Sequence, residues 1–210
     1  MVRWLGSVRR GWMLYHLADA HFSFMYDAAP AGEWVTLDCE TTGLDVRKDK
    51  IVSIGAVRIV GNRLLTSERL ELLVRPDRTL TGANVRVHRL RESDVAKGVP
   101  PEQAMRRLLD FIGSRPLVGY YLEFDVAMIN REVWPMLGVR LPQRKIEVSA
   151  MYYDFKNRQL PAPQRGGDID LRFATMLKDL DLPVRDAHDA LNDAVMAGLA
   201  FVKLRCLLDE

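Results

Sequence analysis

Four carboxylates and one histidine stand in three short segments, separated by long stretches of chain. Asp38 and Glu40 lie near the start, Asp125 in the middle, and His188 and Asp193 near the end. Their neighbours are mostly apolar or small, and carboxylates are rarely buried unless they are paired or hold a metal. The pattern therefore predicts a site for divalent cations, and two-metal cleavage of a phosphodiester is the chemistry that suits it.

Asp38 and Glu40 are two residues apart at the end of an expected strand. Side chains alternate across a strand, so both carboxylates should project to one face while Leu37 and Cys39 turn to the other. An Asp-x-Glu pair alone is weak evidence, because most such pairs are solvated. Here the apolar flanks argue against a surface position.

The other three residues have simple interpretations when each is taken alone. Asp125 follows a short buried strand and could be an ordinary acid at a helix start. Asp193 lies in a helix whose small residues could approach the sheet closely, although a solvated face competes. His188 is five residues before Asp193, and five helical residues turn about 500°, so the two would not share one face of a straight helix. They converge only if His188 lies in a loop or an irregular first turn. A lone histidine there would more often be a cap or a surface residue.

The elements that must position these residues can be traced along the chain. Strands are expected at 34–38, 51–60, 64–74, 116–120 and 146–148, and helices at 102–112, 125–137, 170–180 and 189–207. Short turns between the first three strands imply an antiparallel meander. Residues 153–167 should form a loop because prolines and glycines interrupt them. The expected fold class is α/β, a mixed sheet flanked by helices in one domain.

Length and composition narrow the function classes. The chain has 210 residues, 48% of them hydrophobic, which suits one well-packed domain and argues against disorder. The net charge of +2 neither demands nor excludes a polyanionic partner, so any basic surface must be local. Two cysteines make a disulfide framework unexpected, and a cytoplasmic location fits. No apolar run suits a membrane span or a signal peptide.

Two kinds of segment are candidate binding surfaces. Residues 1–33 are expected to be an N-terminal extension to a domain at 34–210. The extension's apolar residues should pack on the domain or on a partner: Trp4, Leu5, Val8, Trp12, Phe22, Phe24, Met25 and Tyr26. Basic residues form two clusters: Arg140, Arg144 and Lys145, and then Lys156, Arg158 and Arg165. Tyr152, Tyr153 and Phe155 precede the second cluster, which suits single-stranded nucleic acid, although a solvated loop is as good an interpretation.

The three acidic segments resemble the motifs of the DEDD-type 3′–5′ exonucleases of the histidine-containing subclass. This group includes the epsilon proofreading subunit of bacterial DNA polymerase III, ribonuclease T and oligoribonuclease. Residues 38–44 and 49–57 are similar to the first motif, 118–125 to the second, and 188–194 to the third. The resemblance runs from about Trp34 to Leu204. It implies a ribonuclease-H-like fold, with the first three strands antiparallel and the site at the sheet edge.

The resemblance also implies a role for each residue. Asp38 would bridge two divalent ions, Glu40 and Asp193 would complete the first ion's ligands, and Asp125 would bind the second. His188 would be the general base that takes a proton from the attacking water. Oxygen ligands suit Mg²⁺ or Mn²⁺, and a neutral imidazole suits a base near pH 7.

Substrate contacts are expected around these residues. The candidates are Thr41, Thr42, Leu44, His88, Tyr120, Tyr121 and Phe124. Leu44 could wedge against the terminal base, while His88 could equally be structural. The chain departs from the family at Tyr120-Tyr121, where His-Asn is usual. One of these rings should therefore face the site and the other the fold.

The sequence thus predicts a metal-dependent 3′–5′ exonuclease that releases nucleoside 5′-monophosphates from single-stranded DNA or RNA. One alternative is a catalytically idle nucleic-acid-binding accessory protein, which the five retained site residues argue against. Another is a polymerase-associated proofreading subunit. The expected last helix reaches almost to Glu210, which argues against a long C-terminal tether, but residues 1–33 could dock a polymerase or other protein. The choice between DNA and RNA and the oligomeric state stay open.

Overall fold

The computed structural model describes residues 10–75, 97–184 and 189–209. A five-stranded sheet with the order β3-β2-β1-β4-β5 forms its centre. The strands are β1 (Glu33–Thr41), β2 (Ile51–Val60), β3 (Arg63–Leu73), β4 (Leu117–Gly119) and β5 (Lys145–Glu147). The first three pair antiparallel, and β4 and β5 continue the sheet in parallel. The predicted mixed five-stranded sheet is therefore confirmed.

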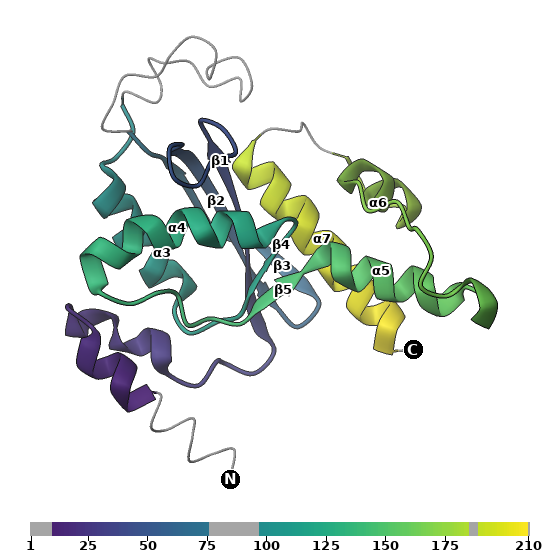
Figure 1. Cartoon of the computed structure of the whole chain (residues 1–210), viewed down its shortest axis with the longest axis horizontal. Coiled ribbons are helices and arrows are strands. Elements are labelled where there is room, and N and C mark those ends of the chain that lie inside the picture. The colour runs from purple at the N-terminus through teal and green to yellow at the C-terminus, as the bar shows by residue number, and fades with distance from the viewer. Residues whose placement is uncertain (1–9, 76–96, 185–188, 210) are drawn as a thin grey trace.

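Helices cover both faces of this sheet (Figure 1). Their bounds are η1 (Ala20–Tyr26), α3 (Pro101–Ile112), α4 (Leu122–Leu137), α5 (Val148–Gln159), η3 (Ala162–Gln164), α6 (Phe173–Asp179) and α7 (Ala190–Asp209), and residues 10–16 are also helical. Helices α3 and α4 belong to one hydrophobic cluster, and α5, α6 and α7 belong to the other. In the described part of the chain, no helix is both long and apolar enough to cross a membrane.

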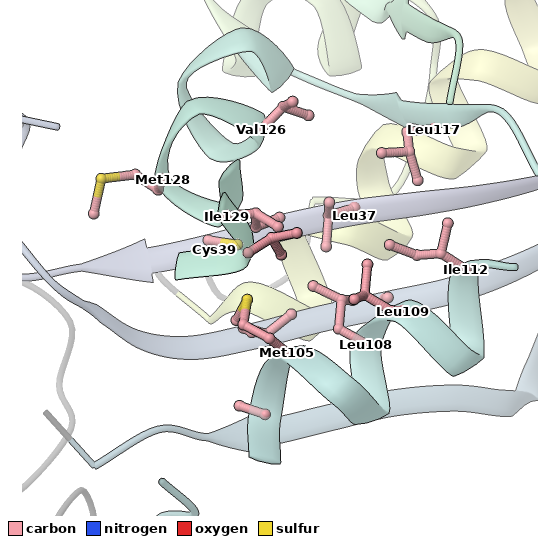
Figure 2. Close-up of a cluster of buried hydrophobic side chains, with 14 of the residues drawn as sticks. Leu37, Cys39, Met105, Leu108, Leu109, Ile112, Leu117, Val126, Met128 and Ile129 are labelled. Carbon is pink, nitrogen blue, oxygen red and sulfur yellow. The ribbon is translucent and has the colours of Figure 1, made fainter. Parts of the chain in front are cut away.

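Strand β1 lies between the two hydrophobic clusters, and its successive side chains point to one cluster and then to the other. Leu37 and Cys39 point to α3 and α4 and pack against residues such as Leu108 and Ile129 (Figure 2). Thr36 lies on the opposite face, where its hydroxyl bonds to the backbone of α7. The even-numbered residues that follow Thr36 on β1 therefore emerge toward α7, as the sequence predicted for Asp38 and Glu40.

The prediction of a loop at residues 153–167 is wrong for its first half, because α5 continues to Gln159. Tyr152 is buried and Phe155 packs on the same cluster, so the apolar face of α5 rests on α7. Tyr152 and Phe155 are therefore part of the core packing, and Tyr153 is partly exposed. Two of the three aromatics suggested for stacking on nucleic acid are thus occupied within the fold, and Lys156 pairs with Asp179 at 2.9 Å.

Several aromatic residues before β1 join the domain core. Phe22 and Met25 are fully buried in the cluster that contains α3 and α4, and Phe24 and Tyr26 pack against it. Trp12 is exposed. The positions Trp4, Leu5 and Val8 lie outside the described residues.

Candidate active site

Three of the predicted carboxylates converge where β1 meets α7. Asp38, Glu40 and Asp193 each offer a carboxylate oxygen, and these oxygens all lie within 4.8 Å of one another. Asp38 and Glu40 come from the last residues of β1, and Asp193 comes from the first turn of α7. The geometry needed to hold a cation is thus assembled from segments more than 150 residues apart in sequence.

Helix α7 can approach these strand residues because Gly55, which lies beneath its first turn, has no side chain. Gly55 of β2 pairs with Asp38 of β1, and a Cβ on Gly55 would lie 2.3 Å from the backbone of Ala190. Only glycine allows the start of α7 to approach so closely. Four residues further along α7, the carbonyl of Ala194 accepts a buried 2.7 Å hydrogen bond from Thr36 Oγ1. Ala194 is the residue after Asp193. These contacts set the position of Asp193 over β1.

Asp125 approaches the same strand from the other side of the sheet. It lies in the first turn of α4, is only 4% exposed, and accepts a hydrogen bond from the backbone N–H of Cys39. Helix α4 begins at Leu122, three residues earlier than predicted. Asp125 is therefore held between Asp38 and Glu40 along β1, close enough for its charge to act on both.

Glu147, which the sequence analysis did not identify, holds the start of α4 in place. One oxygen accepts from the N–H of Leu122 at 2.9 Å, and the other accepts from the N–H of Tyr121 at 3.1 Å. The second oxygen also accepts from the N–H and hydroxyl of Ser149, at 3.2 and 2.8 Å, at the start of α5. Tyr121 has a left-handed backbone with φ of 58°. Glu147 is the last residue of β5 and the N-cap of α5, and glutamate is not among the usual N-cap residues, so the sequence carries little signal for this cap.

The electrostatics of this cluster are unfavourable without cations. Burial raises the pKa of Asp38 well above its usual range, and the charges of Asp125, Asp193 and Glu40 raise it further. Burial likewise raises the pKa of Asp125, although the Cys39 N–H opposes that shift. Like charges this close disfavour simultaneous ionisation. The donors are all carboxylate oxygens, which fits Mg²⁺ or Mn²⁺ better than zinc.

The loop from β1 to β2 presents an exposed leucine four residues after Glu40. Thr42 Oγ1 donates to Asp49 at 2.9 Å and accepts from the N–H of Lys50, while Thr41 Oγ1 donates to Gly43 O. The two threonine hydroxyls thus shape the loop. Leu44, at its tip, is 85% exposed, as a wedge against a base would require. Contacts of Thr41 and Thr42 with a nucleotide stay predictions.

The Tyr120 ring packs within the fold, whereas the Tyr121 ring is exposed. The Tyr120 ring stacks on Phe173 with centroids 4.5 Å apart, and its hydroxyl donates to Leu171 O at 3.1 Å, so this residue belongs to the packing of α6. Tyr121 is 70% exposed. Phe124 is partly buried against the core. Of the two tyrosines, Tyr121 is the one whose ring is accessible to a substrate.

Both predicted histidines, His188 and His88, lie outside the described residues. The structure does describe the residues just after His188. Helix α7 starts at Ala190, and Asp189 Oδ1 accepts from the N–H of Asn192 in the first turn. The convergence of His188 with Asp193 stays a prediction.

Comparison with known proteins supports the resemblance drawn from the motifs. The model of the RNase T family, described as exonuclease, matches residues 35–201. The PolC-type DNA polymerase III of Caldanaerobacter subterraneus subsp. tengcongensis is 26% identical over 188 residues, covering 88% of this chain and 12% of that protein. The DNA polymerase III subunit epsilon of Aquifex aeolicus is 27% identical over 189 residues, covering 86% of this chain and 84% of that protein.

A solved structure shows the same fold. The zinc-bound complex of E. coli exonuclease I with single-stranded DNA matches with a TM-score of 0.68 and 16% identity, over 86% of this chain and 42% of that chain. This chain thus spans less than half of exonuclease I and about an eighth of the PolC-type polymerase. The expected ribonuclease-H-like architecture and the exonuclease resemblance are both confirmed.

Proposed function

The chain belongs to the RNase T exonuclease family, and we propose that it is a metal-dependent 3′–5′ exonuclease that releases nucleoside 5′-monophosphates from single-stranded DNA or RNA. The observation that carries this proposal is the set of oxygens from Asp38, Glu40 and Asp193 within 4.8 Å of one another. Buried Asp125 lies beside them. An idle binding protein would have no need to keep these costly carboxylates together.

Two divalent ions, Mg²⁺ or Mn²⁺, are the cofactors that this donor set fits. Asp38 would contact both, Glu40 and Asp193 would hold the first, and Asp125 would hold the second. Bound there, such ions stabilise the attacking and leaving oxygens of an in-line displacement at phosphorus. The protein's own task is to fix the carboxylates, which the Thr36–Ala194 bond and the Glu147 cap support.

The strand end would be positioned by side chains around the carboxylates. Leu44 would separate the terminal base from the next one, and the exposed Tyr121 ring would stack on a base or sugar. The alternatives of DNA and RNA share this chemistry, because stacking and phosphate contacts are independent of the 2′-hydroxyl. Matched DNA and RNA oligomers decide between them.

His188 would take the proton from the attacking water. The rate should then rise with pH as the imidazole loses its proton. The variant His188→Ala should lose about 10²- to 10⁴-fold in kcat while it still binds Mn²⁺. Loss of Mn²⁺ binding in a calorimetric titration would instead make His188 a metal ligand.

The test of the function is release of nucleotides from 5′-labelled single strands. Full-length chain with Mg²⁺ should shorten the label-bearing strand one nucleotide at a time, and EDTA should stop the reaction. Asp38→Ala should reduce the rate to background. Asp110→Ala removes an exposed acid of α3 that pairs with His21, and it should act at the wild-type rate. Appreciable Mg²⁺-dependent cleavage by Asp38→Ala would refute the two-metal assignment.

A second candidate function is proofreading in association with a polymerase. The similarity to polymerase III epsilon and PolC-type proteins favours it, and residues 1–33 would supply the docking segment. Co-elution of the chain with a replicative polymerase core on size-exclusion chromatography, lost on deletion of residues 1–9, would support this role. A chain that cleaves at full rate and never co-elutes would support the independent exonuclease.

A further inference from the structure

A groove of about 510 Å³ follows one side of α4. Its lining includes Glu123, from the first turn of α4, and Val46, from the β1–β2 loop, whose carbonyl accepts a hydrogen bond from Arg131 of α4. It also includes Trp134 in the last turns of α4 and Arg140, which follows the helix. The lining residues of α4 stand at successive turns of the helix, so the groove extends along it.

The groove and the candidate metal centre share two segments of the chain. Val46 lines the groove and lies in the β1–β2 loop, two residues after the exposed Leu44. Glu123 lines the groove and lies in the first turn of α4, the turn that also carries Asp125, although Glu123 is exposed where Asp125 is buried. A strand whose 3′ end lies at the carboxylates would reach the groove across this loop and this turn.

Three cations line the groove: Lys145, Arg131 and Arg140. Arg131 is held by partly buried groups, since it pairs with Glu132 at 2.9 Å and donates to the carbonyl of Val46. Lys145 Nζ lies 2.7 Å from Glu123, which is mostly exposed, and Arg140 has no ion pair among the described residues. An exposed pair such as Lys145–Glu123 contributes little free energy, so a phosphate can take the place of Glu123 at little cost.

An aromatic ring stands at the far end of the groove. Trp134 is 54% exposed, and the Arg140 guanidinium lies 5.9 Å from the ring centroid. An exposed tryptophan beside arginine is the arrangement that stacks on unpaired bases while it contacts the phosphate chain. Arg140 and Lys145 belong to a basic cluster that the sequence singled out, and the fold adds Trp134 to it.

The dimensions of the groove fit an oligomer. Glu123 and Trp134 are eleven residues apart on one helix, which corresponds to about 16 Å along its axis. A single nucleotide held at the metal centre cannot reach Trp134. Only a strand of several nucleotides spans the distance.

We propose that this groove binds the single strand that lies upstream of the 3′ end, with Trp134 stacked on a base and with Arg140 and Lys145 on phosphates. This inference rests on the proposed exonuclease function. It adds a second contact region, remote from the bond that is cleaved. The enzyme would therefore prefer long single strands to dinucleotides, and the preference would reside in KM.

The experiment measures KM and kcat for a dinucleotide and for a longer single-stranded oligomer. Trp134→Ala should raise KM for the oligomer about 5- to 150-fold, the effect of losing one stacked base, and should leave KM for the dinucleotide and both kcat values unchanged. Trp134→Phe should retain most of the wild-type KM. Arg140→Gln should raise KM for the oligomer and weaken its dependence on salt. Arg63→Gln removes an exposed arginine of β3 outside the groove and should match wild type.

Binding of a 5′-labelled oligomer in EDTA, followed by fluorescence anisotropy, separates this inference from the proposed function. Suppose that the wild type shows no cleavage, while Trp134→Ala binds the oligomer more weakly than the wild type does. The groove would then stand and the exonuclease function would fail. Equal KM and equal affinity for the oligomer in wild type and Trp134→Ala would overturn the groove. An equal rise in KM for the dinucleotide would also overturn it, since that result means general damage to the site.

Discussion

The hydroxyl of Thr36 donates a 2.7 Å hydrogen bond to the carbonyl of Ala194, and both groups are buried between β1 and α7. Thr36 is two residues before Asp38 on the same face of the strand, and Ala194 directly follows Asp193. The bond therefore links the strand that carries Asp38 to the helix that carries Asp193. It fixes the position of α7 along β1 at the level of Asp38 and Asp193.

Thr36→Val should separate this positioning effect from packing, because valine has nearly the same shape and no donor. We expect a loss of about 1–3 kcal/mol in the free energy of unfolding. The Mg²⁺ concentration for half-maximal activity should rise about 10-fold, the usual effect of disturbing a group that orients a ligand. Thr36→Ser keeps the donor and should restore the Mg²⁺ dependence. Urea unfolding and Mg²⁺ titration measure the two effects, and an unchanged Mg²⁺ requirement in the valine variant would contradict the positioning role.

Gly55→Ala tests the close approach of α7 to the sheet. The new methyl group would lie 2.3 Å from the Ala190 backbone, so the start of α7 must move and carry Asp193 away from Asp38. Overpacking of this kind costs about 1–3 kcal/mol or more, and we expect activity to fall further than stability. Gly198→Ala is the matched control, since Gly198 lies on α7 itself and faces the same sheet. Its Cβ meets side-chain carbons of Leu64 and Thr36 at 3.0 Å, which can yield. Equal losses of activity in the two variants would argue against a special role for the close approach at Gly55.

The raised pKa values of Asp38 and Asp125 predict how stability depends on pH without metal. Folding disfavours the ionised carboxylates, so above the ordinary aspartate pKa of 3.8 the folded state binds more protons than the unfolded state. Stability of the metal-free protein should thus fall as pH rises above this ordinary pKa of 3.8. Thermal unfolding in EDTA should show this decline, and Mg²⁺ should reduce it. Asp38→Asn should unfold at a higher temperature than wild type in EDTA at pH 8. A wild-type melting temperature that rises with pH in EDTA would disprove the mechanism.

The sequence was most informative where a local pattern determines the side to which a side chain points. Alternation along β1 put Asp38 and Glu40 on one face and Leu37 and Cys39 on the other, and the structure agrees. The small residues of α7 indicated a close approach to the sheet. These inferences depend on strand and helix periods alone, which a sequence displays directly.

The sequence was less informative where distant segments meet. The bonds from Glu147 to Tyr121 and Leu122 join residues 26 and 25 positions apart, and no local pattern announces them. Helix α5 was not predicted, because residues 153–167 were taken as a loop and Tyr152 and Phe155 as aromatics that could stack on nucleic acid. The contact that buries these two residues comes from α7, far along the chain. Trp134 and Lys145 likewise come together only through the fold.

Glu147→Ala should weaken the start of α4, and with it the placement of Asp125. The variant loses hydrogen bonds at two helix starts, each worth about 0.5–2 kcal/mol, so we expect a loss of about 1–4 kcal/mol in stability. Asp125 should then shift relative to β1, and the Mg²⁺ concentration for half-maximal activity should rise. Glu147→Gln keeps one acceptor oxygen and should lie between wild type and the alanine variant. Denaturant unfolding and Mg²⁺ titration are the measurements.

Ser149→Ala is the control that separates the two helices capped by Glu147. It removes only the 2.8 Å bond from the Ser149 hydroxyl to Glu147 and leaves the N–H groups of Tyr121 and Leu122 bonded. Stability should fall slightly, and the Mg²⁺ dependence should match wild type because α4 stays in place. If Ser149→Ala shifts the Mg²⁺ dependence as far as Glu147→Ala does, the cap on α4 is not what positions Asp125. A wild-type Mg²⁺ dependence in Glu147→Ala would also exclude that role for the cap, since Asp125 would then hold its place without it.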